Sequence, residues 1–112
     1  MESMAVKLLL LKSGEMLISD VTELVKKRQT TPYGYVLDFP HTVTTKPKDS
    51  TNQEIDIVFS PWIVISKETK MTIPNDWVVT IVDPMDDIGK MYVDDMEKVK
   101  SKVENTEDEN VS

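Results

Sequence analysis

Two apolar runs near the start of the chain, separated by a short turn that contains glycine, constrain the fold more than any other feature of the sequence. Residues 6–11 form the first run, Ser13 and Gly14 form the turn, and residues 16–21 form the second run. Two β-prone runs around such a turn are typical of a β-hairpin. The sequence therefore predicts that the fold begins as an antiparallel sheet.

Three further runs rich in aromatic and β-branched residues follow, at 33–45, 55–65 and 77–82. Residues of these types favour a pleated, half-buried surface. Pro40 and Pro61 interrupt the first two of these runs, and a proline inside a strand indicates a bulge, a bend or an edge position. We therefore expect five strands, and we expect residues 71–73 to pair only briefly.

The hydrophobic period changes after Asp83. This residue suits an N-cap, Pro84 suits the first helical position, and acidic residues follow in the first turn. Apolar residues then recur three or four positions apart, as on one face of a helix: Met85, Ile88, Tyr92, Met96, Val99 and Val103. The sequence predicts a single domain at 1–103 that ends in a helix at about 84–103, and an acidic, disordered tail at 104–112.

Charge is distributed unevenly along the 112 residues. The net charge is −7, and residues 83–112 hold ten acids and four bases, so 4 − 10 = −6 of it lies in this last part. An acidic chain is a poor non-specific ligand for nucleic acid, whereas a nearly neutral body with local basic clusters leaves specific binding open. No apolar stretch approaches the roughly 20 residues that cross a bilayer, and we expect a soluble, cytoplasmic protein with no membrane partner.

The residues that usually carry catalysis or bind metals are scarce. The chain has no cysteine and one histidine, His41, so a metal site would depend on carboxylates. Asp86 and Asp87 are explained by the helix dipole, and neither a nucleophile elbow nor a glycine-rich phosphate loop is present. We expect no enzyme activity, no cofactor and no metal site.

Residues 6–21, with Gly14 after the first strand, together with the run Ile-Pro-Asn-Asp-Trp-Val-Val-Thr-Ile-Val-Asp-Pro at 73–84, resemble the Sm-like family. This family includes the eukaryotic Sm proteins, the bacterial host-factor RNA chaperone and small proteins of marine phages. The resemblance covers roughly residues 6–83 and implies a mainly β fold, a small, strongly bent five-stranded barrel, here with a C-terminal α-helix. It also implies a homo-oligomeric ring that binds RNA around its pore, in which the fourth and fifth strands of neighbours pair. Ser19 stands where the family has a second glycine, and residues 66–70 lack the family's Arg-Gly pair.

The candidate nucleic-acid-binding residues are cations that lie near aromatic residues: Lys26, Lys27, Arg28, Tyr33 and Lys70. Cations beside stacking surfaces are the combination that single-stranded nucleic acid uses. The alternative interpretation is a solvated strand end followed by core tyrosines. Two functions therefore stay open: a ring that binds single-stranded RNA through pore-side loops, and a non-enzymatic assembly or protein-interaction module, of phage type, with no role in nucleic-acid binding.

Overall fold

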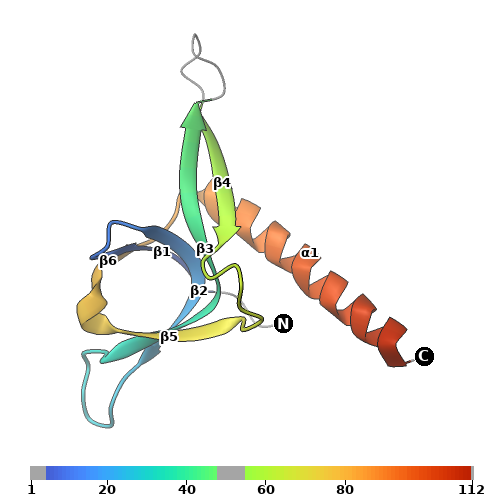
Figure 1. Cartoon of the computed structure of the whole chain (residues 1–112). Coiled ribbons are helices and arrows are strands. Elements are labelled where there is room, and N and C mark those ends of the chain that lie inside the picture. The colour runs from blue at the N-terminus through green and yellow to red at the C-terminus, as the bar shows by residue number, and fades with distance from the viewer. Residues whose placement is uncertain (1–4, 48–54, 112) are drawn as a thin grey trace.

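A computed structural model describes residues 5–47 and 55–111, with side chains described at 5–46 and 56–99. The chain forms a six-stranded antiparallel sheet and one long C-terminal helix (Figure 1). The elements are β1 (Val6–Leu11), β2 (Met16–Leu24), β3 (Gly34–Pro47), β4 (Ile55–Pro61), β5 (Lys70–Pro74), the 3-10 helix η1 (Asn75–Trp77), β6 (Val78–Val82) and α1 (Asp86–Val111). The mainly β class with a C-terminal helix is confirmed.

The predicted hairpin is present as β1 and β2. Leu9 lies opposite Leu17 in the antiparallel register, and Gly14 in the turn has a φ of 93°, which a residue with a side chain rarely adopts. Leu9, Leu11 and Leu17 are buried together on one face of the sheet. Leu8 faces the other way and packs in a second cluster beneath α1. The continuous leucine run therefore follows from a strand that is covered on both faces.

The long strand β3 changes its partner at its centre. Its first half, Gly34 to Asp38, pairs with β5, and its second half, from His41 on, pairs with β4, while β2 lies along its other side. At the change Phe39 has a φ of 54°, and the register with β2 shifts between Ile18 and Asp20. The interruption expected at Pro40 is therefore a bulge and bend that divides one strand between two partners.

The structure has six strands where the sequence predicted five. The additional strand is β5, whose short segment we expected to pair only briefly, and it pairs over its full length with β3. Gly34 makes this possible, because a Cβ at that position would lie 2.8 Å from the carbonyl oxygen of Ile73. The run at 55–65 is correspondingly shorter than expected, since β4 ends at Pro61.

The sheet curves around its own inner face, with β1, β2, β5 and β6 disposed around a common centre (Figure 1). The strand order is β4-β3-β2-β1-β6, with β5 beside β3. Among the described residues, β6 pairs only with β1 and β4 only with β3. The sheet is therefore not closed by pairing: β4 and β6 are the two ends of the strand order, and within the described ranges β5 likewise pairs on one side only, with β3.

The helix α1 covers the outer face of the sheet with the middle of the predicted apolar stripe, whereas Met85 precedes the helix and is 74 % exposed, and the side chain of Val103 lies outside the described residues. Tyr92 and Met96 are buried with Ile18, and Ile88 packs against this cluster. The hydroxyl group of Tyr92 lies 3.0 Å from the carbonyl oxygen of Asp38 and 2.9 Å from that of Phe39, at the bend of β3. The helix thus holds the point at which β3 changes partner.

The C-terminal end of the helix differs from the prediction. We expected the helix to end near Val103, whereas α1 continues to Val111 and extends away from the sheet (Figure 1). Residues 104–111 contain neither glycine nor proline, so nothing in the local sequence terminates a helix that is already nucleated. The segment that we expected to be a disordered tail is helical through Val111. Within the described ranges no helix combines the length and apolar character needed to cross a membrane.

Candidate nucleic-acid interface

The basic triplet lies in the loop of residues 25–33, which connects β2 to β3. The strands end at the pair Leu24 and Gly34, and the amide of Tyr33 donates to the carbonyl oxygen of Leu24 at 2.8 Å. Inside the loop, the amide of Gln29 donates to the carbonyl oxygen of Lys26 at 3.0 Å, and Arg28 has a φ of 71°. The loop is therefore a folded turn that presents Lys26, Lys27 and Arg28 to solvent, not an extension of the strand.

This loop is fixed to the 3-10 helix η1. The side-chain amide of Asn75 donates to the carbonyl oxygen of Pro32 at 2.7 Å, and its backbone amide donates to that of Tyr33 at 3.1 Å. Because η1 is the connection between β5 and β6, Asn75 joins two loops that are about forty residues apart in the sequence. The two connections form one continuous surface, which we call the basic surface, made of residues 25–33 and 75–77.

Two half-exposed aromatic rings lie on the basic surface. Tyr33 is 49 % exposed and Trp77 is 44 % exposed. The ammonium group of Lys26 lies 5.7 Å from the centre of the Tyr33 ring, within range of a cation–π interaction. The carbonyl oxygen of Trp77 accepts a hydrogen bond of 3.0 Å from the amide of Lys12, which fixes the backbone that carries the indole. Cations and accessible π-faces on a fixed backbone are what a single-stranded nucleic acid needs for phosphate contact and base stacking.

Lys70 is not part of this surface. It lies opposite Asp38 at the start of β5, whereas the basic surface begins at the other end of that strand, where Pro74 lies opposite Gly34. Four residues of strand separate the two positions by roughly 13 Å. The structure therefore brings together four of the five predicted residues, Lys26, Lys27, Arg28 and Tyr33, and separates Lys70 from them.

Asn75 and Trp77 belong to the surface and were missed as site residues. The sequence predicts Trp77 as the first residue of the strand at 77–82, whereas Trp77 ends the connection between β5 and β6. The connection is η1, and its signal in the sequence is the polar Asn75-Asp76 pair between two β-prone runs. Asp76 places one acid within the surface. The other tryptophan, Trp62, does pack against the core, and its indole N–H donates to Glu15 at 3.2 Å.

The residues considered for metal binding are held by local contacts. Nδ1 of His41 lies 2.8 Å from the carbonyl oxygen of Phe39. A carboxylate oxygen of Asp87 accepts from the amide of Ile88 at 2.9 Å in the first turn of α1. No three histidine or acidic side chains in the described part of the chain converge as metal ligands would.

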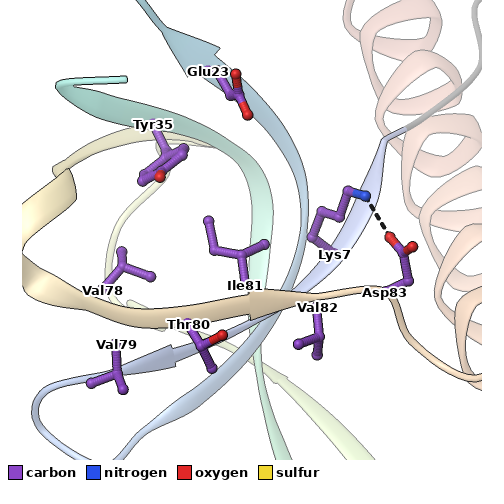
Figure 2. Close-up of a pocket in the computed structure, with 9 residues that line it drawn as sticks. All are labelled: Lys7, Glu23, Tyr35, Val78, Val79, Thr80, Ile81, Val82 and Asp83. Atoms are coloured by element: carbon purple, nitrogen blue, oxygen red, sulfur yellow. Dashed lines mark hydrogen bonds and ion pairs between the residues drawn. The ribbon is translucent and has the colours of Figure 1, made fainter. Parts of the chain in front are cut away.

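A second surface feature is an open groove of about 560 Å³ along β6, lined by residues 78–83 with Lys7, Glu23 and Tyr35. Figure 2 shows that Val78 and Ile81 point toward Tyr35, whereas Val79, Thr80 and Val82 point to the opposite side of the strand. Lys7 and Asp83 form an ion pair at one end of the groove (Figure 2). Val78 and Ile81 pack against the core, whereas Val79 and Val82 are exposed on the other side of β6.

The comparisons identify the family of the chain without naming an activity. No curated protein matches the sequence. The sequence model of one family matches residues 4–97, which include all six strands and most of the part of α1 that packs on the sheet. The chain belongs to this family, DUF6561, a family of unknown function.

Proposed function

We propose that this chain is an Sm-like, ring-forming protein that binds single-stranded RNA through its basic surface. The observation that carries the proposal is the pair of hydrogen bonds from Asn75 that joins the basic loop to η1. Through them the loop that carries Lys26, Lys27, Arg28 and Tyr33 adjoins the connection that carries Trp77. The proposed role is binding without catalysis, and the absence of enzyme activity stays a prediction.

The curvature of the sheet supports an Sm-like barrel as the finer description of the fold. The five expected runs form strands in the expected order, as β1, β2, β3, β4 and β6, with β5 added between the last two. The free edges of β4 and β6, the two ends of the strand order, support assembly into a ring. Two different edges on one chain can pair head to tail, and such contacts generate a ring when the rotation between copies closes. Sheet edges of this kind are otherwise a liability that proteins cover.

Binding to unstructured RNA is tested by fluorescence anisotropy with uridine-rich and adenine-rich oligomers across a range of salt concentrations. We expect binding at low salt, and we expect the logarithm of the association constant to fall linearly with the logarithm of the salt concentration. Each phosphate contact with a single strand contributes about 0.7 to the magnitude of this slope. Replacement of Lys27 and Arg28 by alanine removes two contacts and should flatten the slope by roughly 1.4.

A matched control removes the same charge elsewhere. Lys90 and Lys98 are exposed on α1, far along the sequence from the basic surface, and their double replacement by alanine should leave the slope as in the wild type. Equal effects of the two double variants would mean that net charge, and not the basic surface, determines affinity. No binding of either oligomer by the wild type at low salt would end the RNA proposal.

The alternative is an assembly or protein-interaction module, such as one found in phages, with no nucleic-acid role. Two observations favour it: the net charge of −6 over residues 83–112, and the apolar turn in which Ile63, Val64 and Ile65 are 44 %, 72 % and 98 % exposed. This function would follow if light scattering shows an oligomer and anisotropy shows no RNA binding. Its location in the cytoplasm stays a prediction in either case.

A further inference from the structure

The connection between β4 and β5 presents three consecutive apolar side chains to solvent. In the segment of residues 62–69, Trp62 packs inward on the core, whereas Ile63, Val64 and Ile65 face outward and Ile65 is 98 % exposed. We call residues 63–65 the apolar turn. Soluble proteins rarely expose a contiguous apolar run, and such runs mark interaction sites.

The apolar turn is held in a defined conformation. The amide of Trp62 donates to the carbonyl oxygen of Pro40 at 3.0 Å, and the amide of Phe39 donates to that of Thr69 at 2.6 Å, so both ends are attached to β3. Within the segment, the amide of Ser66 donates to the carbonyl oxygen of Ile63 at 3.1 Å. The hydroxyl oxygen of Ser66 accepts from the amide of Glu68 at 3.0 Å. Because the turn is ordered before any contact is made, docking it costs little conformational entropy.

An apolar strip lies at the other end of the sheet, on the outer side of β6. The register between β1 and β6 passes from Leu10 opposite Thr80 to Leu11 opposite Val78, so Val79 is an extra residue. This bulge turns Val79 to the side that Thr80 and Val82 occupy (Figure 2). Val79 and Val82 are 59 % and 50 % exposed. Without the bulge, alternation along the strand would place these two valines on opposite sides.

We propose that the apolar turn of one copy docks on the strip of Val79 and Val82 of the next copy. The occupant is a second copy because the turn follows β4 and the strip lies on β6, and these two strands are the opposite ends of the strand order β4-β3-β2-β1-β6. A surface at one edge and its complement at the other give a head-to-tail contact. The charges agree with this arrangement: Lys67 follows the turn, and the carboxylate of Asp83, next to the strip, is 78 % exposed although it pairs with Lys7. The inference rests on the ring proposed above and names the surfaces that hold it together.

The first test measures the mass in solution by light scattering at micromolar concentration. Ile65→Asp and Val82→Asp should each convert the oligomer to monomer, since either substitution places a charge in the contact. The exposure of Ile65 means that its substitution leaves the fold intact, which circular dichroism checks. Met16→Asp is the matched control, because Met16 is 43 % exposed and lies on neither surface, and it should keep the wild-type mass.

The second test mixes the two variants in equal amounts. The Ile65→Asp copy retains an intact strip and the Val82→Asp copy retains an intact turn, so the mixture should form a species of twice the chain mass and nothing larger. A mixture that stays monomeric would overturn the head-to-tail contact. An oligomeric wild type whose mass is unchanged by Ile65→Asp would overturn this inference and leave the ring proposal standing. A monomeric wild type would overturn both.

Discussion

Two regions of the molecule use aromatic residues in opposite ways. One is the contact of α1 with the sheet, and the other is the basic surface. Tyr92 is completely buried at the bend of β3, where its ring meets His41 and Phe59 edge to face and its hydroxyl bonds to backbone carbonyls. Tyr33 is half exposed on a loop, with a lysine over its ring. The first tyrosine has all of its partners within the chain, whereas the second has an open face. The comparison separates a residue that stabilises the fold from one that is available to a ligand.

The largest expected effect is on stability at the helix contact. Tyr92→Ala removes a buried aromatic side chain and leaves a cavity beside Ile18 and Met96, so the free energy of unfolding should fall by about 3–5 kcal/mol. Urea denaturation followed by circular dichroism measures this change. Tyr33→Ala is the matched comparison and should cost less than about 0.5 kcal/mol. Equal losses at the two tyrosines would show that the distinction between the regions is wrong.

The next effect is on binding at the basic surface. Tyr33→Ala and Trp77→Ala each remove one stacking ring and should weaken RNA binding by about 1–3 kcal/mol per stacked base. The salt dependence should not change, because neither residue contacts phosphate through a charge. Anisotropy titrations at several salt concentrations measure both quantities. A change in slope without a change in affinity at low salt would contradict stacking as the role of these rings.

A smaller effect sharpens the role of the Tyr92 hydroxyl. Tyr92→Phe keeps the ring and removes the hydrogen bond, which should cost about 1 kcal/mol at neutral pH. Burial raises the pKa of Tyr92 well above its ordinary value, with the charges of Asp20 and Asp38 acting in the same direction. Above about pH 10 the unfolded chain loses the tyrosine proton while the folded chain keeps it, so stability decreases as the pH rises.

The measurement is the melting temperature between pH 8 and pH 11. The wild type and Tyr92→Phe share all other titrating groups, so their difference isolates this hydroxyl. We expect the difference to shrink above about pH 10, since only the wild type has this proton to lose on unfolding. A constant difference across the range would show that Tyr92 titrates alike in the folded and unfolded chains.

The smallest expected effect is on the salt dependence of RNA binding. It distinguishes Lys26 from Lys70, which the sequence predicts equally as binding residues. Lys26→Ala should lower the magnitude of the salt slope by about 0.7, since this ammonium group lies on the basic surface beside Tyr33. Lys70→Ala should leave RNA binding unchanged, because Lys70 lies at the far end of β5. The same anisotropy series measures both variants. An effect of Lys70→Ala as large as that of Lys26→Ala would extend the surface along β5.

Patterns that depend on residues close together in the sequence were sufficient for several elements. The hairpin around Gly14 and the bulge at Pro40 were predicted, because turn chemistry and a missing amide act within a few residues. A helix after Asp83 was also predicted, but it begins at Asp86, so Asp83 is not its N-cap and pairs with Lys7 instead. The stripe that buries Tyr92 and Met96 was predicted from its helical spacing. Of the basic surface, Lys26, Lys27, Arg28 and Tyr33 were predicted, since they lie in one short connection.

The tertiary structure decided which residues far apart in the sequence pair in the sheet or meet on the basic surface. The pairing of β5 with β3 depends on the close approach of Gly34 to Ile73, and a segment of five residues carries little pattern of its own. Asn75 and Trp77 enter the basic surface only because β5 brings η1 to the end of β3. Lys70 leaves it for the same reason, since the register places it at the opposite end of that strand.

By itself the sequence determined five of the six strands, the presence of a helix after them and which residues carry the positive charge. Only the tertiary structure decided which strand edges stay free and which loops meet. The physical reason is that propensity, capping and hydrophobic period are properties of neighbouring residues, whereas strand register and edge exposure depend on pairing between segments that the chain brings together on folding.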